Sequence, residues 1–148
     1  MDLSSFPEEL KSFALKRGAV LKMEMSREDG ITPKHGNEKL KRFVILSVDA
    51  DKLVAASLII NSNINDNLFF KIGPYQHQIF VSDYDFLDHD SYINGYTLHE
   101  FKTERILSEA TYLGCLEEND VQESVDHLID SGNVKPVVLK RYGLAYSK

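Results

Sequence analysis

The sequence contains a single cysteine, no tryptophan and no long apolar run. One cysteine, Cys115, excludes both a disulfide framework and a multi-cysteine zinc site. The longest apolar stretches are far too short to cross a membrane, and the first residues have neither the basic region nor the apolar core of a signal peptide. We therefore expect a cytoplasmic protein with no membrane association, and Cys115 is predicted to be a buried, inert thiol.

The sequence also has no excess of positive charge. It contains 17 Lys and Arg and 23 Asp and Glu, which gives a formal net charge of −6. This balance excludes a protein whose whole surface is basic and binds nucleic acid through many phosphate contacts. Four bases nevertheless lie between Lys34 and Arg42, where Glu38 is the one acid. Such a local field can attract an anion although the whole molecule is acidic.

A length of 148 residues with 43% apolar and 27% charged side chains indicates one folded domain, residues 1–148. Short apolar runs separated by Asn, Asp, Gly and Pro predict many strands. These strands cover residues 19–25, 42–48, 53–60, 68–72, 77–81, 92–93, 96–101 and 137–139. We expect a long loop over 26–39 and a tight hairpin turn at Asp49–Lys52.

Two helices are predicted at the margins of these strands. Residues 1–17 have Ser5 as a candidate N-cap, Pro7 in the first turn and Gly18 at the end. Residues 119–131 have helical apolar spacing, and Asn119 with Gln122 forms a candidate capping box. The pattern predicts a mainly β (α+β) fold: a small barrel or curled antiparallel sheet over 18–116, with a C-terminal extension over 132–148.

The first candidate site lies where two predicted strands meet. In a hairpin, the start of one strand lies beside the end of the next. Lys41 and Arg42 are therefore expected at the same edge of the sheet as Asn61 and Ser62. Cations and amide donors that converge there suit a phosphodiester, although a solvated strand end with a polar turn has the same composition.

Two further sets of polar residues are candidates for chemistry. Four aspartates between positions 83 and 90, with His89 among them, suit a hard cation, but the spacing does not fit a calcium loop and a solvated loop is the simpler interpretation. The histidines together with a lysine could supply acid–base chemistry, yet their spacing brings no two of them together: His35, His77, His89, His99 and His127. His35 stands out because it lies beside the four bases between Lys34 and Arg42, here called the basic cluster.

The order of several short segments resembles the MazF/PemK-like toxins, which are endoribonucleases of toxin–antitoxin modules. The matching segments are Arg17–Val20, Lys41–Ser47, Ile59–Ser62, Ser91–Leu98, Thr103–Ile106, Leu113–Gly114 and the helix over 121–129. The resemblance implies an SH3-like barrel, a homodimer and an antitoxin protein as partner. It also implies cleavage of single-stranded RNA by 2′-hydroxyl attack, with no metal and no cofactor.

The resemblance assigns roles to residues of the first candidate site and of the basic cluster. The place of the family's arginine falls on Lys41, which is a departure because lysine is a point charge that can lose its proton. Arg42 stands where the family often has proline, and the place of the hydroxyl residue falls on Ser62. Lys41, Arg42 and Ser62 are thus the predicted catalytic residues, and the predicted RNA-binding residues are Lys34, His35, Lys39, Asn61 and Asn63.

Two alternatives remain open from the sequence. A non-catalytic module on the same barrel would use its acidic surface to bind a partner protein. A metal-dependent enzyme would instead use the aspartates between Asp83 and Asp90.

Overall fold

The computed structural model describes residues 7–31, 38–62 and 73–147. Its strands are β1 (Ala19–Ser26), β2 (Glu38–Val48), β3 (Val54–Asn61), β4 (Gln76–Ile79), β5 (Ser91–Asn94), β6 (His99–Lys102) and β7 (Thr111–Cys115). Its helices are α1 (Glu8–Ala14), α3 (Thr103–Glu109), α4 (Glu118–Asp130) and α5 (Pro136–Arg141), with 3-10 turns η2 (Arg27–Asp29) and η4 (Gly73–Tyr75). Among these described helices, none is long and apolar enough to cross a bilayer.

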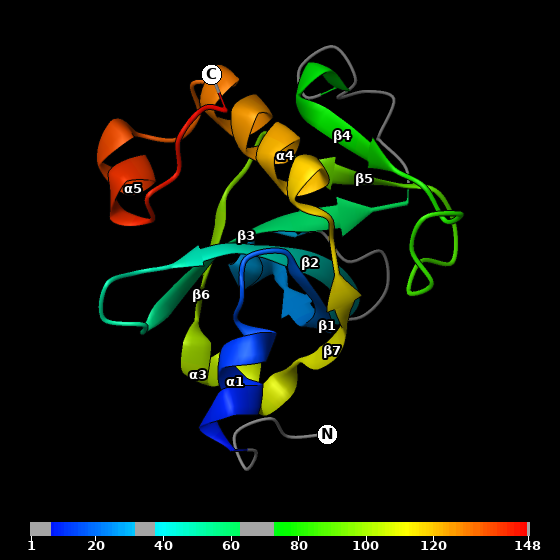
Figure 1. Cartoon of the computed structure of the whole chain (residues 1–148), viewed down its shortest axis with the longest axis vertical. Helices are drawn as coiled ribbons and strands as arrows, with labels where there is room; N and C mark the ends of the chain where they lie inside the picture. The colour runs from blue at the N-terminus through cyan, green and yellow to red at the C-terminus, as the bar shows by residue number, and fades with distance from the viewer. Residues whose placement is uncertain (1–6, 32–37, 63–72, 148) are drawn as a thin grey trace.

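One antiparallel sheet of seven strands organises the molecule (Figure 1). Its order is β4-β5-β3-β2-β1-β7, and β6 pairs with β3. β5 and β6 lie along the same edge of β3, because β2 occupies its other edge. The mainly β (α+β) class is confirmed, whereas closure of the sheet into an SH3-like barrel stays a prediction.

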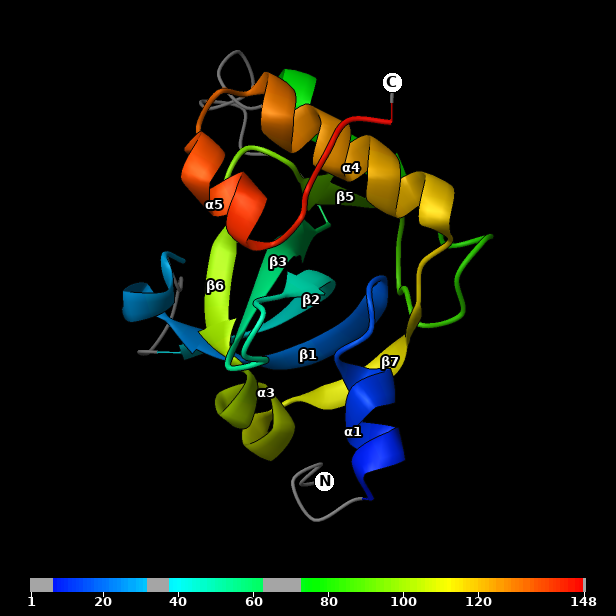
Figure 2. The same ribbon diagram turned by 60° about the vertical axis from the view of Figure 1, so that its left-hand side comes forward.

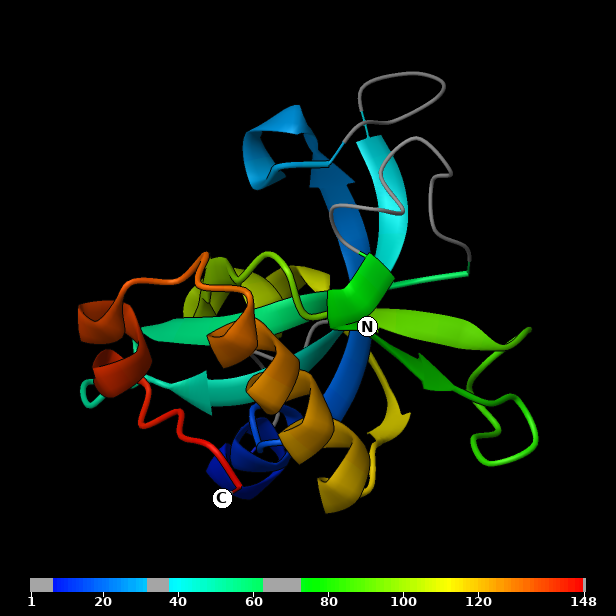
Figure 3. The ribbon, with the colours of Figure 1, turned by 90° about the horizontal axis from the view of Figure 1, so that it is seen from above.

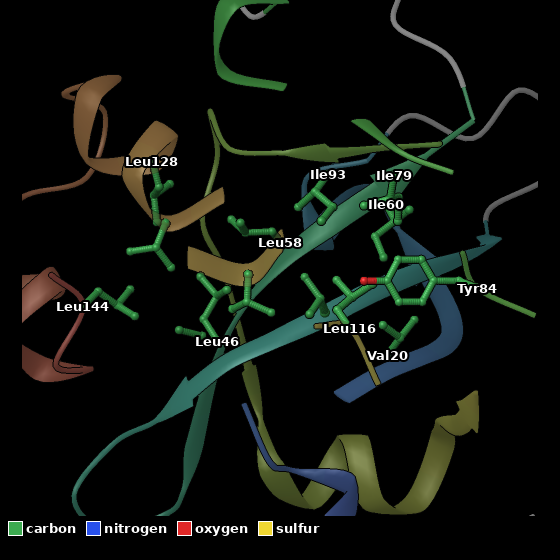
Figure 4. Packing of buried hydrophobic residues seen from close by; sticks show 14 of the residues in the cluster. Val20, Leu46, Leu58, Ile60, Ile79, Tyr84, Ile93, Leu116, Leu128 and Leu144 are labelled. Atoms are coloured by element: carbon green, nitrogen blue, oxygen red, sulfur yellow. The ribbon is translucent and has the colours of Figure 1, made fainter. Parts of the chain in front are cut away.

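Both faces of the sheet are covered, as the continuous apolar runs of β2 and β3 require. Figure 2 shows α4 and α5 on one side and α1 with α3 on the other. Val44 and Leu46 join the core cluster beneath α4 and α5, here called the α4-side core, whereas Phe43 and Ile45 join the α1-side core. Figure 4 shows the α4-side core, with Leu128 of α4 packed near Leu58 of β3.

The predicted hairpin is confirmed in β2 and β3. Asp49 closes its turn, because Oδ1 accepts hydrogen bonds from the Leu53 and Val54 amides at 2.8 and 3.2 Å. β2 begins at Glu38, four residues earlier than expected, because its start pairs with the end of β1, where Ser26 faces Glu38. The predicted loop over 26–39 is therefore too long at its C-terminal end. Figure 3 shows these paired ends, in blue and cyan, projecting away from α4.

Other boundaries differ for identifiable reasons. The predicted strand over 137–139 is wrong: these residues lie in α5, where Pro136 occupies the first turn with a backbone angle suited to a helix. The predicted helix over 119–131 is confirmed as α4, but Asn119 is not its cap; the N-cap is Glu117 and makes no side-chain cap bond. α3 and β7 are absent from the prediction. The predicted strand over 68–72 and the candidate N-cap Ser5 lie outside the described residues.

Candidate functional site

The basic end of β2 lies beside the end of β3. Arg42 pairs with Ile60 across the two strands, which places Lys41 opposite Asn61. The Lys41 ammonium donates a hydrogen bond to Asn61 Oδ1. The expected proximity of the two strand ends is confirmed, while the roles of these residues remain predictions.

Strand alternation divides the predicted residues between the two faces of the sheet. Lys41 and Asn61 lie on the face of the α1-side core, like Phe43 and Ile59. Arg42 lies on the opposite face, where its Nη2 donates to Asp88 Oδ2 at 2.9 Å. Backbone geometry therefore directs the two adjacent cations to opposite faces of the sheet, although both also border one cavity at the strand ends.

Arg42 and Ser62 border a cavity of about 170 Å³ at the point where β2 continues beyond β3. Lys39, Lys41, Asp88, His89 and Ser91 also contribute to its walls. Within the part of the chain that the structure describes, the buried Arg42 Nε has no hydrogen-bond partner. A small anion in this cavity would meet the guanidinium and a hydroxyl group, with the Asp88 carboxylate as its competitor.

The ammonium group of Lys41 is poorly hydrated for a lysine. Burial lowers the pKa of Lys41 to about 8, and the nearby charge of Lys39 acts in the same direction. An amine with this pKa is protonated at neutral pH yet gives up its proton readily. Lys41 thus combines a positive charge with the capacity to act as an acid.

His99 lies on the same face of the sheet as Lys41, and the sequence alone did not distinguish it from the other histidines. It precedes Phe101 by two residues in β6, and the two rings stack with centroids 6.1 Å apart. Its Nδ1 lies 3.0 Å from the Asp29 carbonyl oxygen. Because a carbonyl only accepts, Nδ1 carries the proton and Nε2 holds the free electron pair of the neutral ring.

Burial lowers the pKa of His99, an effect that the charge of Lys41 reinforces and that contacts with Asp29 oppose. The ring is therefore neutral at physiological pH. His99 also borders a cavity of about 340 Å³, whose other walls include Glu28, Gly30 and Thr97. The His99 side chain thus borders open space, and the charge of Lys41 is close enough to lower its pKa.

A rigid turn holds the carbonyl that orients His99. The Asp29 carboxylate is 10% exposed, lies 2.5 Å from the Arg105 guanidinium, and has its pKa lowered chiefly by that hydrogen bond. The same carboxylate accepts the Ser26 amide at 2.8 Å. Gly30 follows with φ 85°, and a Cβ there would lie 3.4 Å from His99 Cε1. The backbone of η2 therefore covers one edge of the imidazole.

The remaining candidates are the aspartates between positions 83 and 90, which are exposed, and the other histidines. Asp88 bonds to Arg42, and Asp90 accepts the Val81 amide at 2.9 Å; no group of three His, Cys, Asp or Glu among the described residues could hold a metal ion. Sequence spacing gave no reason for two histidines to meet, and packing of α4 against β4 brings the rings of His77 and His127 to 6.3 Å from each other.

Two further expectations have clear outcomes or limits. Cys115 is exposed, so the prediction of a buried thiol is wrong; it ends the edge strand β7, where one side of the backbone faces outward. Lys34, His35 and Asn63 lie outside the described residues, so their predicted contribution to RNA binding stays a prediction.

No protein-family model matches the chain, and no curated protein matches it either. The resemblance to MazF/PemK-like toxins therefore has no independent support, and a function must be argued from the chain's own residues.

Proposed function

We propose that this chain is a metal-independent endoribonuclease that cuts single-stranded RNA by attack of a 2′-hydroxyl on the adjacent phosphate. The observation that carries the proposal is the half-buried Lys41 ammonium, held by Asn61 and poised to lose its proton. A desolvated cation is a strong stabiliser of the charge that develops on a pentacoordinate phosphate. The resemblance to MazF/PemK-like toxins points to the same reaction.

In the proposed reaction, the 2′-oxygen forms a bond to phosphorus while the bond from phosphorus to the 5′-oxygen breaks. Lys41 neutralises the phosphate and gives its proton to the departing 5′-oxygen. Asn61 orients the ammonium group through its side-chain oxygen. The products are a 2′,3′-cyclic phosphate and a free 5′-hydroxyl.

Arg42 and Ser62 have a binding role in this proposal, because both border the cavity at the end of β3. They bind a neighbouring phosphate of the RNA chain in this cavity of about 170 Å³. The exposed Asp88 carboxylate must leave Arg42 for this to happen. Binding through so few cations is expected to be weak and to fall with salt. We also propose that the chain forms a homodimer and binds an antitoxin protein, as the resemblance implies.

The test is incubation of purified protein with single-stranded RNA in the presence of a chelator, with analysis of the product ends. We expect Lys41→Ala to reduce cleavage by about 100-fold or more, because proton transfer and charge stabilisation are both lost. Lys140→Ala, at an exposed lysine of α5, should cleave like the wild type. Intact RNA with the wild type, or equal cleavage by Lys41→Ala, would contradict the proposal and favour the protein-binding alternative.

A further inference from the structure

We infer that His99 is the general base of the reaction, taking the proton from the attacking 2′-hydroxyl through Nε2. This inference rests on the proposed function and adds a residue on a third strand, far from the basic cluster in sequence. It is carried by three geometric observations: the shared face with Lys41, the oriented imidazole and the adjoining cavity.

The first observation is the placement of His99 relative to the proposed acid. β6 pairs with β3 so that His99 lies opposite Ser57, and the Ser57 hydroxyl donates to the His99 carbonyl oxygen at 3.1 Å. β3 also carries Asn61, the partner of Lys41, on the same face. One strand thus positions both groups, with the acid near its end and the base nearer its middle.

The second observation is the orientation of the ring. The Asp29 carbonyl oxygen holds the proton on Nδ1, and Phe101 stacks on the ring at an interplanar angle of 12°. Such an arrangement fixes the tautomer and the plane of the imidazole before substrate binds. A preoriented base loses less freedom in the transition state. Nε2 is the nitrogen that this arrangement leaves for the substrate.

The third observation is the space beside the ring. The cavity of about 340 Å³ that His99 borders has the size of a small-ligand site. The nucleoside that carries the attacking hydroxyl enters this cavity, while its 3′-phosphate extends toward Lys41. The 2′-proton moves to Nε2 as the bond from 2′-oxygen to phosphorus forms, and Lys41 supplies a proton to the 5′-oxygen. One proton is taken and one is given, so the step balances.

Burial is the largest influence on the pKa of His99, and the charged groups around the ring modify it. They are Lys41 on β2, Asp29 and Glu28 of η2, Glu100 on β6 and Arg105 on α3. Lys41 favours the neutral ring, whereas the Asp29 contacts favour the charged ring, and burial outweighs the latter. The neutral base and the protonated lysine therefore coexist around neutral pH, as the reaction requires.

The experiment compares His99→Asn with the wild type. The introduced asparagine amide can still donate to the Asp29 carbonyl but cannot accept a proton, so the fold and RNA binding should persist. We expect kcat to fall by about 100-fold to 10,000-fold, with loss of the rise in rate on the acidic side of the pH profile. The matched control is His127→Asn on α4, which should keep the wild-type rate and profile.

A second measurement separates a catalytic role from a merely structural one. Added imidazole should restore part of the cleavage by His99→Ala, in proportion to the concentration of its neutral form. Wild-type rates or an unchanged acidic limb in His99→Asn would overturn the inference, as would the absence of rescue by imidazole. If the wild type cuts RNA, Lys41→Ala does not and His99→Asn cuts normally, the inference fails and the proposed function stands. If the wild type cuts no RNA, both fail together.

Discussion

Replacement of Lys41 by methionine should make the protein more stable and, under the proposed function, should abolish cleavage of RNA. The ammonium of Lys41 is held in a half-buried position, and burial lowers its pKa from 10.5 to about 8. Each unit of pKa is worth about 1.4 kcal/mol of differential interaction, and solvent screening of a half-buried group reduces the total to about 2 kcal/mol. The folded state loses this amount at neutral pH by keeping the group charged. Methionine removes the charge and keeps a flexible apolar stem of similar length.

Part of this gain is offset by the lost contact with Asn61. The hydrogen bond from Lys41 to Asn61 Oδ1 contributes about 1 kcal/mol, and its loss leaves a half-buried acceptor. The net effect is a stabilisation of about 1 kcal/mol, the difference between the two contributions. For a domain of this size that corresponds to a rise in Tm of about 3 °C.

The assay is urea unfolding at pH 7 and at pH 9.5, with Lys102→Met at an exposed lysine as the control. The folded-state pKa of Lys41 lies below its unfolded value, so the unfolded chain binds more protons between about pH 8 and 10.5. The stability of the wild type therefore gains relative to Lys41→Met across this window, and the advantage of the variant shrinks. A variant less stable than the wild type at pH 7, or a difference that does not change with pH, would refute the reasoning.

Two further predictions concern the stability of the fold, one where Gly95 packs against η4 and α4 and one at η2. Gly95→Ala should destabilise the fold by about 2 kcal/mol or more, measured by thermal unfolding, because the added Cβ would lie 2.5 Å from the Tyr75 carbonyl oxygen. Asp29→Asn should lose the ion pair with Arg105 and be about 1–3 kcal/mol less stable at pH 7. Because the pKa of Asp29 is lowered in the fold, the wild type should lose this advantage as the pH falls below about 4, so the two proteins should converge in acid unfolding.

The centre of the sheet could be predicted from the sequence because its signals are local. β2 and β3 are apolar over most of their length, which is the pattern of strands buried on both faces. The Asp49 turn between them needs a side chain that accepts nearby amide hydrogens, and aspartate does so within five residues. Pairing of the two strands then brings Lys41 to Asn61 without any long-range information.

The elements that the sequence did not predict depend on contacts between distant segments. α5 contains Val137, Val138 and Leu139, whose β-branched and apolar side chains favour a strand locally; packing of Tyr142 and Leu144 into the α4-side core accompanies the helical conformation instead. The role of His99 depends on Asp29, which is 70 positions away in the chain. No spacing rule within β6 contains that information.

Lys41 and Arg42 lie on opposite faces of β2 because of strand geometry. A count of charged residues along the sequence does not show this. Adjacent residues of a strand point to opposite faces, so a strand that includes both cations cannot direct both toward one point by backbone geometry alone. The two cations therefore have different partners: Arg42 pairs with the exposed Asp88 carboxylate, whereas Lys41 donates to Asn61 and its charge lowers the pKa of His99. The count of bases between Lys34 and Arg42 does not reveal this difference.

The desolvated ammonium is the stronger reason to look for chemistry on the α1-side face. Burial disfavours the charged form of Lys41, whereas Arg42 satisfies part of its charge with an exposed partner. Charged groups that lower the stability of the fold are typical of functional sites, because activity needs a charge that burial disfavours. Lys41 has this property, and the face that it occupies also carries an oriented imidazole. The direction of the Lys41 pKa shift and the orientation of the His99 ring therefore draw attention to the same face of the sheet, which is where the proposed acid and base lie.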